Sequence, residues 1–73
     1  MEIKTFAITR TKLWIESNPV YIAAESHMDA VSSMGKPCRR IYNDRFRQIE
    51  QTGDYYRVTD MSKGGKSFIF EIT

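Results

Sequence analysis

The stretch YYRVTDMSKGGKSFIFEI, residues 55–72, contains two runs of strand-forming residues separated by a segment rich in glycine and lysine. Residues 55–60 and 67–72 are aromatic and β-branched, which favours strands. Residues 62–65 read SKGG, and glycine accepts the positive φ that a turn between antiparallel strands requires. The stretch therefore predicts a β-hairpin, to which the rest of a sheet can be added.

The same segment contains the end of a phosphate-binding loop pattern, G-x-x-x-x-G-K-[ST]. Gly65, Lys66 and Ser67 match that end, but the position five residues before Gly65 is Asp60 rather than glycine. A phosphate loop is also followed by a helix whose amides bind the anion, whereas residues 67–72 are typical of a strand. We therefore interpret the segment as a turn.

Three further strands are expected from composition. The first covers residues 2–10 and continues or bends into residues 12–15. A turn at Asn18 and Pro19 precedes the second, at residues 20–24. Another is expected at residues 46–51, before a turn at residues 52–54.

One short helix is expected between the second and third of these strands. Ser26 followed by Asp29 is typical of a helix start, and Gly35 is typical of a helix end. Inside it, apolar residues recur at a spacing of three, at Met28, Val31 and Met34, and this stripe is expected to pack in the core.

These elements predict an α+β fold: a small antiparallel sheet of four to five strands with one short helix packed on one face, in the order β-β-α-β-β-β. Residues 1–73 are expected to form a single domain with a small core. The side chains expected toward the helix are those of Ile49, Tyr56, Val58, Phe68, Phe70 and Ile72. Those expected outside or at an edge are those of Arg47, Tyr55 and Arg57.

The single cysteine, Cys38, cannot form an internal disulfide, so a reducing compartment is expected. The first ten residues mix charged and apolar side chains, unlike a signal peptide. No run approaches the roughly 20 apolar residues of a membrane span. The protein is therefore expected in the cytoplasm, without membrane contact.

Catalytic and metal-binding patterns are absent from the sequence. His27 is the only histidine, and Cys38 lies eleven positions away, which is not a zinc-ligand spacing. His27 is expected to be exposed in the first helical turn, and Cys38 to be structural. The carboxylates are scattered over turns, caps and strand faces rather than paired. We therefore expect no enzyme activity, no cofactor and no metal.

Charge is unevenly distributed. The segment KPCRRIYNDRFR, residues 36–47, holds five basic residues and one acid, a net +4, whereas the whole chain carries +2. Its arginines are interleaved with Tyr42 and Phe46, a combination that suits phosphates and bases, a protein interface, or a solvated loop whose aromatic rings turn inward. The segment does not match the RNA-recognition signature K/R-G-F/Y-G/A-F-V-x-F/Y.

The order of several short motifs resembles a known family. Residues 24–26 read AES and Ala30 follows in the expected helix, then come Cys38, the RQIE run at residues 47–50 and the KGGK turn at residues 63–66. This arrangement is similar to the small phage-encoded anti-CRISPR proteins, most of all to the ninth family of inhibitors of the type I-F surveillance complex. The similarity covers roughly residues 20–72.

The resemblance implies a non-enzymatic, phage-type inhibitor in the host cytoplasm that binds a bacterial CRISPR effector complex and blocks target DNA. That family carries adjacent basic residues after the helical alanine, where this chain has Val31 and Ser32. The basic residues that contact the partner would then lie at other positions. The candidate partner-binding residues are Lys36, Arg39, Arg40, Tyr42, Arg45, Arg47, Lys63 and Lys66.

Two alternatives come from other classes of protein. A small regulatory protein could contact nucleic acid directly, binding phosphates through the arginine-rich segment. A structural protein could instead form a homodimer through residues 67–72, if that last strand is an open sheet edge.

Overall fold

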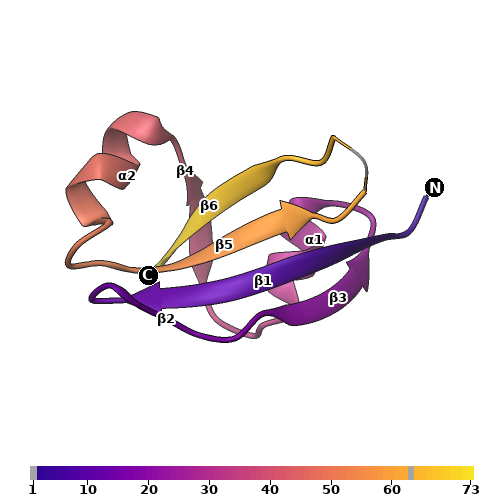
Figure 1. The fold of residues 1–73 in the computed structure, drawn as a ribbon, viewed down its shortest axis with the longest axis horizontal. Coiled ribbons are helices and arrows are strands. Elements are labelled where there is room, and N and C mark those ends of the chain that lie inside the picture. The colour runs from indigo at the N-terminus through magenta and orange to yellow at the C-terminus, as the bar shows by residue number, and fades with distance from the viewer. Residues whose placement is uncertain (1, 63) are drawn as a thin grey trace.

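The computed structural model describes residues 2–62 and 64–73, and these form six strands and two short helices (Figure 1). All strand pairs are antiparallel. The α+β class and the small antiparallel sheet are thus confirmed, whereas four to five strands and one helix were too few. The elements are β1 (Lys4–Lys12), β2 (Ile15–Glu16), β3 (Val20–Ala24), α1 (His27–Ser32), β4 (Cys38–Ile41), α2 (Asn43–Ile49), β5 (Asp54–Asp60) and β6 (Ser67–Ile72).

The longest strand, β1, is an interior strand of the sheet. One side of β1 pairs with β5 along most of its length, and the other pairs with β3 and then β2. Beyond β5 follow β6 and, at the far edge, β4. Phe6 and Ile8 alternate with less buried residues because successive side chains of a strand point to opposite faces.

The chain reverses between β1 and β2 in a tight turn, so residues 12–15 bend rather than continue the first strand. Leu13 and Trp14 form the turn with φ values of 50° and 69°. Such left-handed conformations suit Asn and Gly, which makes a Leu-Trp turn unusual. Both side chains are exposed.

Helix α1 follows the expected signals. The Ser26 side chain accepts a hydrogen bond from the Asp29 amide at 3.2 Å, which satisfies one free amide of the first turn. Gly35 adopts a φ of 79° after the helix, where a side chain would be strained. Val31 is fully buried, but Met28 is 48% exposed, so its predicted place in the core is wrong.

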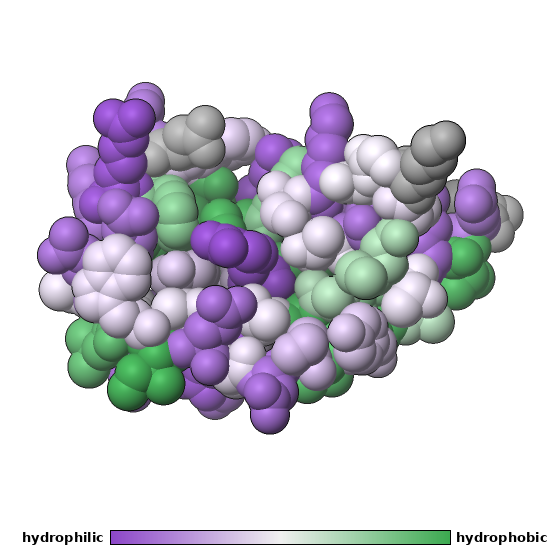
Figure 2. All heavy atoms as spheres, viewed as in Figure 1, coloured by the Kyte–Doolittle hydropathy of each residue, from purple (hydrophilic) through white to green (hydrophobic). Residues whose placement is uncertain are grey.

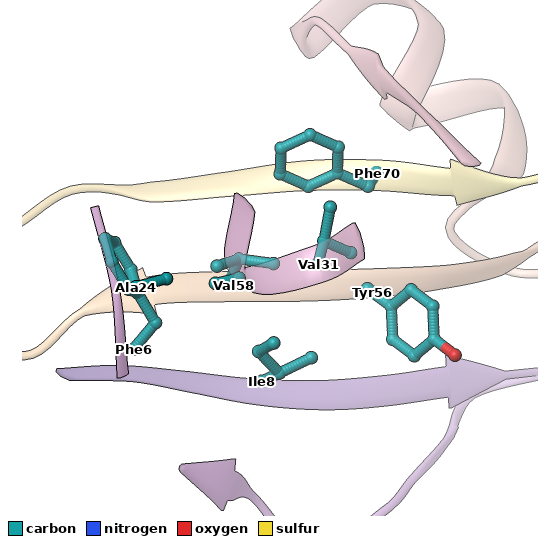
Figure 3. Packing of buried hydrophobic residues seen from close by; sticks show 8 residues of the cluster. Phe6, Ile8, Ala24, Val31, Tyr56, Val58 and Phe70 are labelled. Atoms are coloured by element: carbon teal, nitrogen blue, oxygen red, sulfur yellow. The ribbon is translucent and has the colours of Figure 1, made fainter. Parts of the chain in front are cut away.

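The main core lies between α1 and one face of the sheet (Figure 3). Ala30 and Val31 of the helix pack against side chains from four strands. The fully or nearly fully buried members are Phe6, Ile8, Ala24, Ala30, Val31, Tyr56, Val58 and Phe70. The prediction that Tyr56, Val58 and Phe70 face the helix is confirmed.

The segment at residues 38–50 differs from the prediction. Residues 38–41 form the edge strand β4, and residues 43–49 form helix α2 where a strand at 46–51 was expected. Phe46 and Ile49, three positions apart, share one side of a helical turn, with Arg47 and Gln48 being good helix formers. The observed order is therefore β-β-β-α-β-α-β-β.

A second, smaller core lies under α2 on the other face of the sheet. Ile41, Ile49 and Tyr55 are its buried members, with Phe46 and Ile69 packed against them. The rings of Phe46 and Tyr55 meet edge to face, 5.1 Å apart. Tyr55 is thus buried rather than outside, and Ile49 does not reach the main core, because a helix covers the face that was expected to be open.

Residues 61–62 and 64–66 lie between β5 and β6. The Asp60 amide donates to the Lys66 carbonyl at 3.1 Å, and the Gly65 amide donates to the Ser62 carbonyl at 2.9 Å. Gly64 has a φ of 74°. A strand follows instead of a helix, which confirms the turn interpretation. Strand β6 lies between β5 and β4, so residues 67–72 are not an open edge as was considered.

Candidate interaction surface

Strand β4 presents two of the candidate arginines at one edge of the sheet. Among residues 2–62 and 64–73, β4 pairs with β6 alone. Arg39 and Arg40 are successive residues, so their side chains leave opposite faces of the strand. Arg39 lies on the face covered by α2, and Arg40 lies on the face covered by α1.

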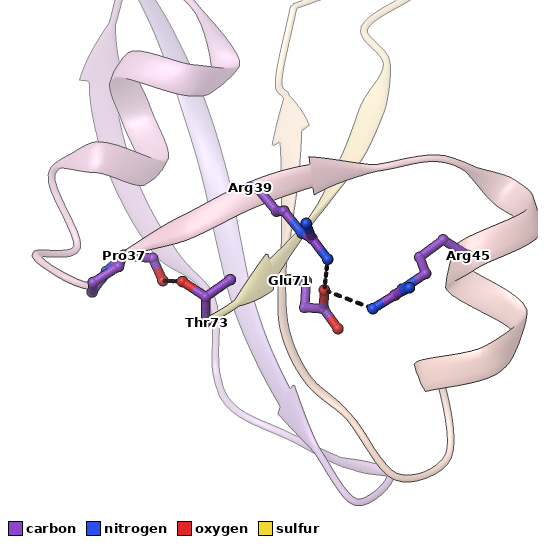
Figure 4. A network of polar contacts seen from close by, with 5 residues as sticks. All are labelled: Pro37, Arg39, Arg45, Glu71 and Thr73. Atoms are coloured by element: carbon purple, nitrogen blue, oxygen red, sulfur yellow. Dashed lines mark hydrogen bonds and ion pairs between the residues drawn. The ribbon is translucent and has the colours of Figure 1, made fainter.

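Arg39 and Arg45 converge on one carboxylate (Figure 4). Glu71 of β6 stands opposite Arg39 in the strand register. Its Oε1 atom lies 3.4 Å from a terminal nitrogen of Arg39 and 3.7 Å from one of Arg45. The two guanidinium side chains are 62% and 50% exposed, whereas the Glu71 side chain is 18% exposed. The three groups together carry one net positive charge, presented by the arginines.

The Arg40 guanidinium lies over two aromatic rings. Its guanidinium carbon is 3.7 Å from the centroid of the Phe68 ring and 4.6 Å from that of Tyr42. A cation held over a ring face is attracted by the ring quadrupole, which fixes the guanidinium while its edge stays available for hydrogen bonds. Tyr42 is 67% exposed.

A shallow hollow of about 380 Å³ adjoins this cation–aromatic stack. It combines one cation and one acid with apolar walls. Its lining residues are Arg40, Ile41, Tyr42, Asp44, Ser67, Phe68 and Ile69.

The remaining candidate cations lie apart from these two groups. Lys36 is exposed in the turn before β4, Arg47 is exposed in the last turn of α2, and Lys66 is exposed just before β6. Lys63 lies outside the described residues. The described part of the structure therefore divides the predicted surface into an Arg39–Arg45 pair, an Arg40–Tyr42 stack and three separate cations, Lys36, Arg47 and Lys66.

His27 is half-buried, so its expected exposure is wrong. Its ring lies 4.1 Å from the ring of Phe68 and 4.8 Å from that of Phe6. Nε2 lies 2.7 Å from the Lys66 carbonyl oxygen, which accepts a hydrogen bond from the Nε2–H tautomer. His27 thus ties the start of α1 to the loop before β6.

Cys38 packs at the margin of the main core. Burial raises the pKa of its thiol, which keeps it protonated near neutral pH. Its place at the edge of the core fits the expected structural role.

A second surface was missed by the sequence analysis. Large apolar side chains are exposed along the other edge of the sheet and its turn, and Figure 2 shows hydrophobic atoms at the lower left, over the β1–β2 turn. The exposed residues of this edge are Leu13, Trp14, Ile15, Val20 and Tyr21. A signal was available in the turn position of Leu13 and Trp14, which lacks the usual polar residues.

In the part of the chain that the structure describes, no helix is long and apolar enough to cross a membrane. The described residues also contain no cluster of three or more histidine, cysteine or acidic side chains that could hold a metal ion. No protein-family model, curated protein or solved structure matches the chain.

Proposed function

We propose that this protein is a non-enzymatic, phage-type inhibitor that acts in the host cytoplasm by binding a bacterial CRISPR effector complex and blocking target DNA. The observation that carries the proposal is the β4 edge, from which Arg39 and Arg40 extend on opposite faces. The partner is proposed from the resemblance to the anti-CRISPR proteins, which lies in the order of motifs from residue 24 through the KGGK turn.

The proposed mechanism is competition for a surface. In this mechanism the cationic β4 edge contacts an acidic or polar surface of the effector complex, next to the place where the complex receives DNA. A small protein that covers about 800 Å² of such a surface excludes DNA sterically without any reaction. The arginines accelerate encounter and fix the orientation of docking more than they determine affinity.

The β4 edge also offers a way to dock. The Thr73 amide donates a hydrogen bond to the Pro37 carbonyl, so these two facing residues form a hydrogen-bonded pair. Hydrogen-bonded pairs recur at every second position along antiparallel strands, so Arg39 and Glu71 form the next such pair. The backbone groups of Arg40 therefore point away from β6. A partner strand can add to these groups while both arginine side chains contact it.

The proposal is tested with purified type I-F surveillance complex immobilised on resin. The complex is expected to retain the wild-type protein and then to lose binding of its target DNA. The double variant Arg39→Gln with Arg40→Gln is expected to be retained at least tenfold less tightly. Lys12→Gln with Arg57→Gln removes the same charge at exposed positions away from β4 and serves as the matched control.

An unretained wild-type protein, or equal loss in the test and control variants, would contradict the proposal. Circular dichroism of each variant establishes that the sheet is intact. Retention by the complex with no effect on DNA binding would contradict the blocking mechanism.

Direct nucleic-acid binding is the second candidate function, and the Arg40–Tyr42 stack favours it. An exposed ring beside a fixed guanidinium suits a base that stacks while its phosphate is neutralised. This function predicts tight binding of bare DNA that falls steeply with salt for any sequence. Bare DNA binding without retention by the effector would replace the first proposal with the second.

A further inference from the structure

Strand β3 forms a sheet edge of a different kind from β4. It reads VYIAA, without a charged residue, and Val20 and Tyr21 are exposed. In the part of the chain that the structure describes, β3 pairs with β1 alone. Monomeric proteins usually protect a sheet edge with lysines, prolines or bulges, since an unprotected edge pairs with other strands. Pro19 and Glu25 flank β3 but leave its five residues unprotected.

The backbone of β3 has groups directed away from the sheet. The Thr5 carbonyl accepts from Met61 on the β5 side, and the Arg10 carbonyl accepts from Ser17 on the opposite side. Even-numbered residues of β1 therefore bond toward β3, and Ile22 is in a hydrogen-bonded pair with Phe6. The N–H and C=O groups of Tyr21 and Ala23 consequently point outward, four groups in all.

We propose that a second copy of this chain pairs with β3, strand against antiparallel strand, to form a two-fold symmetric dimer with one continuous sheet. With the axis at Ile22, Tyr21 of each copy stands opposite Ala23 of the other. These two positions carry the outward groups, so the register forms four hydrogen bonds between the copies. It is an isologous interface, in which the same patch serves both copies.

Side-chain sizes fit this register. Tyr21 is 61% exposed and the small side chain of Ala23 leaves room for its ring across the pair. The same register places Val20 opposite Ala24, so a larger side chain again faces a small one.

Charge explains why a second copy fits β3 and not β4. Self-pairing of β4 would bring Arg39 and Arg40 of one copy against those of the other, and like charges opposite each other are destabilising. Self-pairing of β3 meets no such repulsion. An acidic or basic partner would likewise find no complementary charge among the five residues of β3.

The inference is tested by sedimentation from micromolar to submillimolar concentration. The wild-type protein is expected to approach twice the 8.5 kDa chain mass. The variant Tyr21→Lys with Ala23→Lys places lysines opposite each other in both pairs and is expected to be monomeric. Both positions are exposed, so the fold should persist. Gln48→Lys with Gln51→Lys adds the same charge at exposed positions beyond β3 and should remain dimeric.

A charge-exchange experiment checks the register. Tyr21→Glu with Ala23→Glu is expected to be monomeric alone, and an equal mixture with the lysine variant is expected to form a heterodimer. A monomeric wild-type protein throughout the range would overturn the inference. Dimers that survive the lysine substitutions, or a mixture that stays monomeric, would overturn it as well.

Hydrogen exchange of the wild-type protein gives a test that needs no variant. The outward amides of Tyr21 and Ala23 should become protected as concentration rises, whereas the amide of Ile22 should be protected at every concentration. Protection of Tyr21 and Ala23 that does not depend on concentration would overturn the dimer. Neither result bears on the β4 edge, so failure here is distinct from failure of the proposed function.

Discussion

Arg10 of β1 donates its Nε–H to Oδ1 of Asp54 of β5 at 2.9 Å, across the longest strand pair of the sheet. A second contact joins the other carboxylate oxygen to a terminal nitrogen of the guanidinium, so the pair is bidentate. The hydrogen bond from Arg10 holds the pKa of Asp54 below its ordinary value.

This relationship predicts how stability depends on pH. Since the pKa of Asp54 is lower in the folded than in the unfolded chain, its contribution is fully present above the unfolded value of about 4 and is lost as the pH falls through the folded value. Asp54→Asn should cost about 1 kcal/mol at neutral pH, the upper range for a partly exposed pair. Urea unfolding at pH 7 and at pH 2.5 to 3 measures the difference, which should shrink in acid. A difference that is constant with pH would contradict the ion pair.

The two glycines of the β5–β6 loop should respond differently to alanine. A Cβ at Gly65 would overlap the Asp60 carbonyl, which is backbone and fixed by the strand. A Cβ at Gly64 meets open space and suffers only from its positive φ. We expect Gly65→Ala to lower the free energy of unfolding by roughly 3 kcal/mol and Gly64→Ala by about 1 kcal/mol. Urea denaturation compares them, and equal losses would show that the loop is built differently.

Substitutions in the turn at Leu13 and Trp14 should raise the stability of the fold. Leu13 and Trp14 occupy left-handed conformations that Asn and Gly adopt with less strain. The variant Leu13→Asn with Trp14→Gly should therefore raise the free energy of unfolding by about 1 kcal/mol, since the exposed side chains lose little burial. Thermal unfolding measures the gain, and a lower midpoint would mean that these side chains stabilise the fold.

Glu71 should weaken the binding of partners to Arg39 and Arg45. Glu71→Gln removes the carboxylate that Arg39 and Arg45 share, which frees both guanidinium groups for an acidic or phosphate partner. Binding to the effector, or to bare DNA in the second candidate function, is expected to strengthen several-fold and to depend more steeply on salt. Glu16→Gln makes the same charge change on β2, and calorimetric titration should find no effect there. Weaker binding by Glu71→Gln would mean that the carboxylate positions the arginines productively.

Much of the fold was predictable because its signals are local. The Ser26 cap, the Gly35 end of α1 and the alternation around Val58 each depend on a few neighbouring residues. Strand β4 was missed because four residues with two arginines carry little strand signal. Helix α2 was missed because Phe46 and Ile49 are the only apolar residues of its seven, and two residues three positions apart are too few to indicate a helical period.

The candidate site was less predictable than the fold. Its arginines were identified from composition, but their grouping depends on the register between β4 and β6. That register places Glu71 beside Arg39 although the two are far apart in sequence. A half-buried His27 likewise follows from a contact with Lys66 that no local pattern indicates.

The interior position of β1, with partners on both sides, has a consequence for synthesis in the cell. During translation β1 can pair early with β2 and β3, but its longest partner, β5, emerges only after most of the chain has been made. Long-range pairing of this kind slows folding and leaves apolar strand edges unpaired meanwhile. The nascent hairpin would then be the stage at which chaperones or premature association act, before β5 and β6 complete the sheet.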